Sequence, residues 1–195
     1  MSTYVGKPVA RIDALEKVTG QAVYCGDIDL PGMLYGATLR SPLPHARIDQ
    51  VDVSAALRVS GVKAVVTGKE FPYIFGTMIK DQPFLAAGRV RYVGEPIAAV
   101  AAESELAAQE AVERIKVVYT ELPAVFDLKD AIADGAPVIH EKMHEYFGAR
   151  FYHSVPGTNI CTVREYENGD IAAGFAASDE IFEDEFYVQA VAHTR

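Results

Sequence analysis

Cysteine is scarce in this sequence, since the 195 residues include only Cys25 and Cys161. Two cysteines so far apart form neither a disulfide framework nor a zinc site. An iron–sulfur cluster needs about four thiolates, so we expect none to be held by this chain alone. Cys25 lacks a neighbouring base that would mark it as a nucleophile, and we expect it to be a buried structural cysteine.

Basic charge and long apolar runs are also lacking. The chain has 18 lysine and arginine residues against 27 acidic ones, a net charge of −9, whereas nucleic-acid and anionic-membrane surfaces need clustered positive charge. No stretch approaches the ~18 apolar residues of a membrane helix, and residues 1–7 contain no apolar signal region. We therefore expect a soluble, cytoplasmic protein without nucleic-acid or membrane partners.

Motifs for nucleotides and metals are weak or absent. No glycines form Gly-x-Gly-x-x-Gly or a phosphate loop. His140, Glu141 and His144 formally match the zinc-protease pattern His-Glu-x-x-His. That pattern needs a supported helix and a third ligand, but Pro137 precedes it, Gly148 follows it, and no third ligand has the expected spacing. We expect no metal site there.

Hydrophobic residues make up 50% of the chain, enough to bury a core without disulfides or metals. Period-2 and β-branched runs predict strands, and capped patterns of helical period predict helices. The expected strands cover residues 33–40, 48–53, 62–67, 97–101, 114–119, 159–166 and 181–193. The expected helices cover residues 54–59, 104–115, 128–133 and 171–177, the last three with Ser104, Asp127 and Asp170 as N-caps.

The helix expected at residues 104–115 has the clearest pattern, because Ala108, Ala111, Val112 and Ile115 share one face. Strands before and after it predict a strand–helix–strand unit. His45 follows a proline-broken strand, and we expect a hydrogen-bonded turn histidine there. A pH-responsive or interface role for His45 is the alternative.

Residues 68–88 form the longest irregular stretch expected, punctuated by glycine and proline. Unusually for a loop, it is rich in large apolar side chains: Phe71, Tyr73, Phe75, Met78, Ile79, Phe84 and Leu85. Such a loop either folds onto its own domain or lines a pocket shared with another domain.

Four separated motifs carry a family resemblance. They lie at residues 6–27, 39–48, 90–123 and 168–193, and the third opens with Val90-Arg91-Tyr92-Val93-Gly94-Glu95-Pro96. In this order they resemble the amino-terminal part of the molybdenum-binding subunit of the xanthine dehydrogenase and aldehyde oxidase family. The resemblance implies an α+β fold: an α/β-hammerhead domain over residues 1–145, then the truncated first strands of a molybdenum cofactor-binding domain over residues 146–195.

The resemblance also implies a function for a larger parent protein. That parent would hydroxylate a heteroaromatic ring or an aldehyde with water-derived oxygen at a molybdenum–molybdopterin centre. Its partners would be the downstream molybdenum-binding domain, an iron–sulfur subunit and an FAD-binding flavin subunit. No catalytic, cofactor-binding or metal-binding residue of the family can be carried onto this chain, which we expect to be inactive alone. Phe75, Met78 and Ile79 lie where relatives place a substrate-channel wall. We expect Met78 and Ile79 to be unusually exposed, or to be covered by another copy of the chain.

Two other classes of function stay open. The chain can be a stand-alone hammerhead module for binding or assembly, without redox chemistry. It can also be a small independent enzyme that uses the histidine-rich stretch near residues 140–153. The sequence does not distinguish purine, aldehyde, nicotinate, carbon monoxide or aromatic thioester as the parent's substrate.

Overall fold

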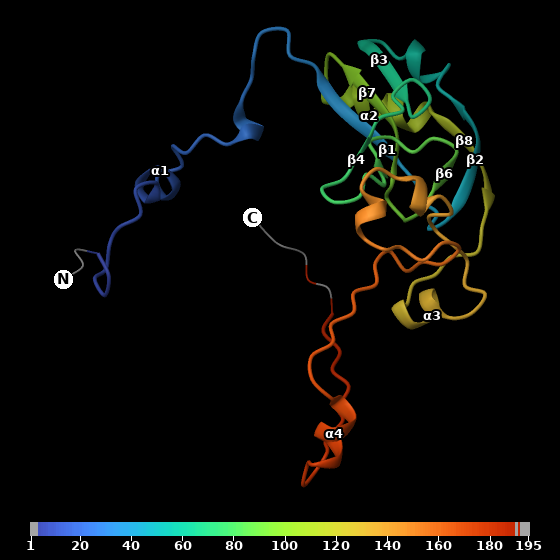
Figure 1. Cartoon of the computed structure of the whole chain (residues 1–195). Helices are drawn as coiled ribbons and strands as arrows, with labels where there is room; N and C mark the ends of the chain where they lie inside the picture. The colour runs from blue at the N-terminus through green and yellow to red at the C-terminus, as the bar shows by residue number, and fades with distance from the viewer. Residues whose placement is uncertain (1–3, 190, 192–195) are drawn as a thin grey trace.

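The computed structural model describes residues 4–189 and 191. A folded body lies between two extended segments, one carrying α1 and the other α4, which project away from it (Figure 1). Within the described residues, no helix has the length and apolar character needed to cross a membrane. The α-helices are α1 (Ala14–Val18), α2 (Glu105–Arg114), α3 (Leu128–Ile132) and α4 (Ile171–Ala176). The 3-10 turns are η1 (Cys25–Asp27), η2 (Ala56–Arg58), η3 (Met143–Glu145) and η4 (Ala149–Phe151).

Two three-stranded antiparallel sheets form the body, in the orders β1-β7-β3 and β6-β2-β8. The first sheet contains β1 (Tyr35–Arg40), β7 (Pro96–Ala102) and β3 (Val62–Thr67). The second contains β6 (Arg89–Val90), β2 (Ala46–Asp52) and β8 (Lys116–Glu121). A separate hairpin joins β4 (Ile74–Phe75) to β5 (Gln82–Pro83).

Strand β7 lies between two buried clusters. Ala98, Val100 and Ala102 face a core shared with Ala108 and Ala111 of α2. Their small side chains let the helix backbone approach the sheet closely, so α2 packs against β1 and β7. Ile97 is fully buried in a second cluster, with Ala46, Ala86 and Val90. An almost wholly apolar strand is what burial on both faces requires.

Several local predictions are confirmed. The predicted β3 matches the observed strand residue for residue. The hydroxyl of Ser104 accepts a hydrogen bond from the Ala107 N–H at 3.2 Å, and Asp127 and Asp170 cap α3 and α4 in the same way. Ile115 is buried at the end of α2, as its pattern predicts. The short helix predicted at residues 54–59 is reduced to the 3-10 turn η2.

The predicted strand–helix–strand unit is observed as β7, α2 and β8, and its two strands lie in different sheets. The strands on either side of α2 form, but β7 belongs to the first sheet and β8 to the second. Each strand pairs with segments distant in sequence, and no local pattern specifies that choice. Helix α2 is therefore a crossover between sheets.

The strands predicted at residues 159–166 and 181–193 are wrong for the residues that the structure describes. Residues 190, 192 and 193 lie outside those residues. A strand needs a neighbour that pairs its backbone N–H and C=O groups along its length, and the described residues of these two segments form no such ladder. Phe182, Phe186 and Val188 are accordingly 82%, 85% and 87% exposed. Cys25 is exposed rather than buried, because the segment that carries it extends away from the body.

Amide hydrogen exchange should report this division. Strand β7 is paired on both sides, whereas residues 181–189 lack regular backbone pairing. We expect amides of β7 to exchange at least about a hundred-fold more slowly than those of residues 181–189. Uniform protection along the chain, measured by mass spectrometry, would show that the second segment is folded against the body.

Candidate functional site: the β4–β5 hairpin and its polar cleft

An aromatic cluster holds the base of the β4–β5 hairpin. The ring of Phe84 lies 4.6 Å from that of Phe75 and 5.8 Å from that of Phe71, between centroids. Phe71 also contacts Tyr73, with 4.7 Å between ring centroids. The loop predicted to be irregular therefore packs largely on itself. Phe75, the first of the three predicted channel residues, belongs to this cluster and keeps 43% of its surface exposed.

Met78 and Ile79 lie in the connection between the two strands of the hairpin. Met78 is 63% exposed, as predicted, whereas Ile79 is only partly exposed. Gly76 shapes this connection, because its φ is +154° and a Cβ there would lie 1.9 Å from the carbonyl oxygen of Ile79. The structure thus brings the three predicted residues into one hairpin, with Met78 the most exposed of them.

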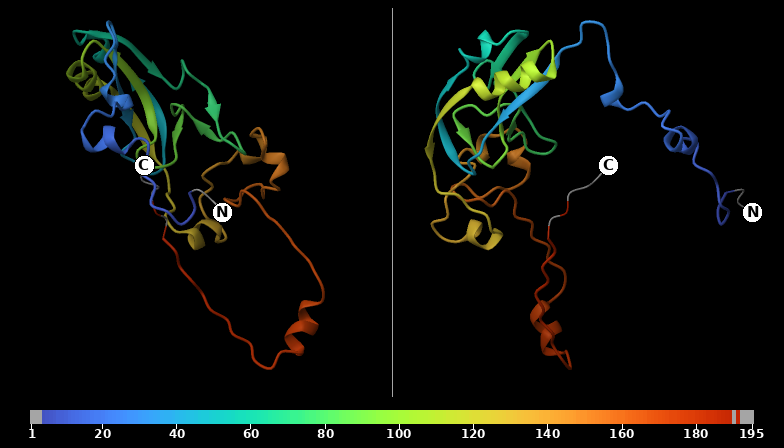
Figure 2. Two further views of the ribbon diagram at one scale, coloured as in Figure 1. Left: turned by 90° about the vertical axis from the view of Figure 1, so that its left-hand side faces the viewer. Right: turned by 180° about the vertical axis from the view of Figure 1, so that it is seen from behind.

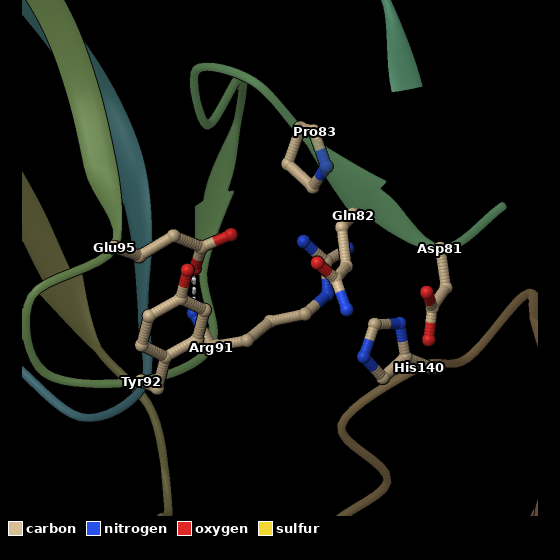
Figure 3. Close-up of a pocket in the computed structure, with 7 residues that line it drawn as sticks. All are labelled: Asp81, Gln82, Pro83, Arg91, Tyr92, Glu95 and His140. Carbon is tan, nitrogen blue, oxygen red and sulfur yellow. Dashed lines mark hydrogen bonds between the residues drawn. The ribbon is translucent and has the colours of Figure 1, made fainter. Parts of the chain in front are cut away.

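A polar cleft of about 260 Å³ opens beside the same hairpin (Figure 3). It is lined by Asp81, Gln82, Pro83, Arg91, Tyr92, Glu95 and His140. Figure 3 shows the Arg91 side chain reaching across the cleft toward Gln82 and His140. The Arg91 Nε donates to the carbonyl of Ile139 at 3.3 Å, which ties the segment after α3 to the start of the Gly-Glu-Pro turn.

Desolvation shifts the pKa values of two titratable groups of the cleft, the buried Glu95 and the half-buried His140. Glu95 is only 2% exposed, and desolvation raises the pKa of its carboxyl group. The backbone N–H and the positive charge of Arg91 offset part of that rise. Desolvation lowers the pKa of His140, and the nearby Arg91 charge lowers it further, while Asp81 acts in the opposite direction. Both shifts favour the neutral forms of these side chains.

The cleft is small for a ligand site. Its volume lies below the roughly 300 Å³ at which ligand pockets usually begin. Within it, the Nδ1 of His140 lies 3.2 Å from the Tyr146 hydroxyl. The cleft is polar and lies where the hairpin, the Gly-Glu-Pro turn and the segment after α3 meet.

Metal binding finds no support among residues 4–189 and 191. No group of three or more His, Cys, Asp and Glu side chains there is arranged to hold a metal ion. His140 lies outside any helix, and His144 lies in the short turn η3, so the His-Glu-x-x-His pattern is not presented on one helix face.

His45 is the hydrogen-bonded turn histidine that the sequence predicts. It is 4% exposed, and its Nδ1 lies 2.6 Å from the carbonyl oxygen of Pro123. The Leu122 N–H donates to the His45 carbonyl at 2.9 Å. His45 thus fastens the end of β8 to the start of β2, a structural role.

Comparison with known proteins decides the family. Residues 19–123, more than half of the chain, match the profile described as aldehyde oxidase and xanthine dehydrogenase, a/b hammerhead domain. The chain belongs to this family. The family resemblance of the four sequence motifs and the α+β hammerhead fold are both confirmed.

Curated relatives of this family member align over almost its whole length. It is 42% identical over 193 residues to a probable xanthine dehydrogenase subunit of Bacillus subtilis (strain 168). It is 36% identical over 191 residues to the nicotinate dehydrogenase large molybdopterin subunit of Eubacterium barkeri. Each alignment covers 97% of this chain, but only 24% and 41% of the respective relative. The hammerhead chain thus spans a minor part of each relative.

Solved structures support the same placement. A Cu,Mo-CO dehydrogenase matches with a TM-score of 0.66 and 32% identity, over 70% of this chain and 18% of that one. Quinoline 2-oxidoreductase from Pseudomonas putida 86 matches with a TM-score of 0.62 and 36% identity, over 69% of this chain and 18% of that one. Both are oxidoreductases by name, and the first is named as a molybdenum enzyme.

The polar cleft was not predicted from the sequence. Arg91 and Glu95 stand inside the third family motif, but nothing local links them to His140, which comes after α3. The one available signal was the density of charged and aromatic residues immediately after the apolar loop.

Proposed function

We propose that this chain forms the amino-terminal part, with the hammerhead domain, of the molybdopterin-binding subunit of a xanthine dehydrogenase-like molybdenum hydroxylase. The observation that carries the proposal is the alignment of 97% of the chain with a relative named as a large molybdopterin subunit. The subunit would hydroxylate a heteroaromatic ring or an aldehyde with water-derived oxygen. Residues 1–145 would form the hammerhead domain, and residues 146–195 would begin the cofactor-binding domain.

We assign no residue of this chain to the binding of molybdopterin. The cofactor, which supplies the redox chemistry when bound, would be held by other parts of the subunit. Iron–sulfur clusters and FAD would be held by partner subunits. Two relatives carry the word subunit in their names, one of them as a large subunit, which supports an assembly of several chains.

Within that enzyme, Phe75, Met78 and Ile79 would form part of the substrate-channel wall. Exposed thioether and aromatic groups suit an apolar passage, because methionine adapts its shape to different ligands. The hairpin offers Met78 at an exposed position, and the contact between the Phe75 and Phe84 rings joins the two sides of its base. The aromatic contacts thus lie at the base of the hairpin, and the adaptable Met78 lies in the connection between its strands.

Met78→Ala should change substrate binding in the assembled enzyme more than it changes the chemical step. We expect the KM of a bulky aromatic substrate to change about three-fold or more, with kcat within about two-fold, because a channel wall acts on access rather than on bond making. Steady-state kinetics with one small and one bulky substrate measure this.

Leu106→Ala is the matched control, since Leu106 is 76% exposed on α2, away from the hairpin. It should leave both KM values unchanged. Equal kinetics for Met78→Ala and the parent enzyme with every substrate would remove Met78 from the channel wall.

A further inference from the structure

On the basis of the channel role proposed for Met78, we infer that Gly148 is a positioning residue for substrate selectivity. It belongs to residues 139–151, a segment we call the brace. In Figures 1 and 2 the brace, in orange, lies beside the β4–β5 hairpin. The brace fixes the connection that carries Met78, so it sets the shape of the channel wall without lining it.

A main-chain hydrogen bond joins the brace to the connection. The Lys80 N–H donates to the carbonyl of Phe147 at 3.0 Å. The same two residues meet through their side chains, with the Lys80 ammonium 5.0 Å from the centroid of the Phe147 ring. Lys80 lies two residues after Met78, so this bond holds the backbone that presents the Met78 side chain.

Gly148 makes the closest approach. Its φ of +92° lies in the left-handed region that favours glycine, and a Cβ there would lie 2.1 Å from the carbonyl oxygen of Met78. The obstacle is main chain, not the end of a flexible side chain. Any side chain at position 148 would therefore have to displace the Met78 peptide or the brace. The absence of a Cβ lets the two segments touch.

Several contacts hold the brace in place against the rest of the folded body. The Arg89 guanidinium pairs with the Glu141 carboxylate at 3.0 Å, and the Arg91 Nε donates to Ile139. Met143 and Ala149 are 8% and 1% exposed, so the turns η3 and η4 are packed into the body. With a fixed brace and a more exposed connection, strain introduced at Gly148 should move Met78.

The chain offers a close control for Gly148→Ala. Gly157 also has a positive φ, +76°, but a Cβ there would meet nothing within 4 Å. Gly148→Ala and Gly157→Ala therefore share the backbone strain of alanine in this region and differ in the contact with Met78. Both variants can be made in the full chain and in the hydroxylase assembled with it, alongside Met78→Ala.

In the full chain, we expect Gly148→Ala to speed exchange of the Lys80 amide about ten-fold or more and to shift the methyl resonance of Met78. Gly157→Ala should change neither. In the assembled enzyme, Gly148→Ala should change the kcat/KM ratio of a bulky to a small substrate about three-fold through KM, in the manner of Met78→Ala. An unchanged Lys80 amide in folded Gly148→Ala would overturn the inference.

Kinetic measurements on Met78→Ala and Gly148→Ala distinguish the positioning role of Gly148 from the channel proposal. If Met78→Ala alters selectivity while Gly148→Ala does not, Met78 stays in the channel wall and the positioning role of Gly148 is wrong. If neither alters selectivity, the channel proposal itself fails. Should Gly148→Ala not fold, the unmodified chain still provides a test. Its Lys80 amide must exchange about ten-fold more slowly than the amide of Thr77, and equal rates would show that the bond to Phe147 holds nothing in place.

Discussion

Replacing Ile97 with alanine is expected to lower the free energy of unfolding by about 2–5 kcal/mol. Ile97 is 0% exposed and is the largest fully buried side chain of the described residues. It follows the Gly-Glu-Pro turn at the start of β7 and fills the cluster with Ala46, Ala86 and Val90. Strand β7 is paired on both sides, so the backbone is poorly placed to collapse into the void that alanine would leave.

Urea denaturation of the Ile97→Ala variant measures this loss. Leu106→Ala removes a similar apolar volume from the exposed face of α2 and should change the free energy of unfolding by no more than about 0.5 kcal/mol. A loss below about 1 kcal/mol for Ile97→Ala would mean that β7 does not form the centre of the core.

Substitution of Glu95 should have the second large effect. Its buried carboxylate accepts the Arg91 N–H, while its carbonyl oxygen accepts the Ser41 N–H at 2.9 Å. Glu95→Ala leaves the half-buried Arg91 N–H without this acceptor, which costs about 1–3 kcal/mol. Glu95→Gln keeps an acceptor oxygen at the same place and should recover most of that loss at neutral pH. Equal losses for the two variants in urea denaturation would show that the acceptor does not matter.

We also expect the stability difference between the unmodified chain and Glu95→Gln to depend on pH. In the unfolded chain, the pKa of Glu95 has its ordinary value of about 4.3. In the folded chain, burial raises the pKa above that value. Between the ordinary and the raised pKa, the folded state holds the proton more firmly than the unfolded state does. Stability from this group is therefore greatest at low pH and falls as pH rises through that window. Glutamine has no such proton, so Glu95→Gln should gain stability relative to the unmodified chain as pH rises.

The difference in free energy of unfolding between the unmodified chain and Glu95→Gln separates the effect of Glu95 from that of the other carboxyl groups. Hydrogen bonds lower the pKa values of Asp13, Asp49, Asp52 and Glu70, which act in the opposite direction in both proteins. Denaturation of each protein from about pH 4 to pH 8 therefore tests the sign directly. A difference in stability that stays flat, or that moves in favour of the unmodified chain as pH rises, would contradict a raised pKa for Glu95.

Local chemistry made much of the fold predictable. The β-branched run of β3 and the capped, periodic pattern of α2 specify their own structures, because the determining groups lie within a turn or two of one another. The division of β7 and β8 between two sheets was not predictable, since it depends on pairing with β1, β3 and β2. Pairing over such distances is decided by the packing of the whole body.

Residues 181–189 show that a local pattern alone does not determine a strand. Alternation of Phe182, Phe186 and Val188 predicts a strand, but alternation only says which face a strand would bury if a partner existed. In the part of the chain that the structure describes, these side chains are exposed. At the candidate site, composition indicated Phe75, Met78 and Ile79. The approach of Gly148 to the Met78 carbonyl required the arrangement of two loops in space.

Molybdenum content of a chimeric subunit tests the central claim most directly. In the Eubacterium barkeri large molybdopterin subunit, the segment that aligns over 191 residues can be exchanged for this chain. If this chain is the hammerhead part of such a subunit, the chimera should co-purify with its partner subunits and carry about as much molybdenum as the natural subunit by mass spectrometry of the metal. The purified chain alone should carry none. Stoichiometric molybdenum on the isolated chain, or a folded chimera without the metal, would contradict the account.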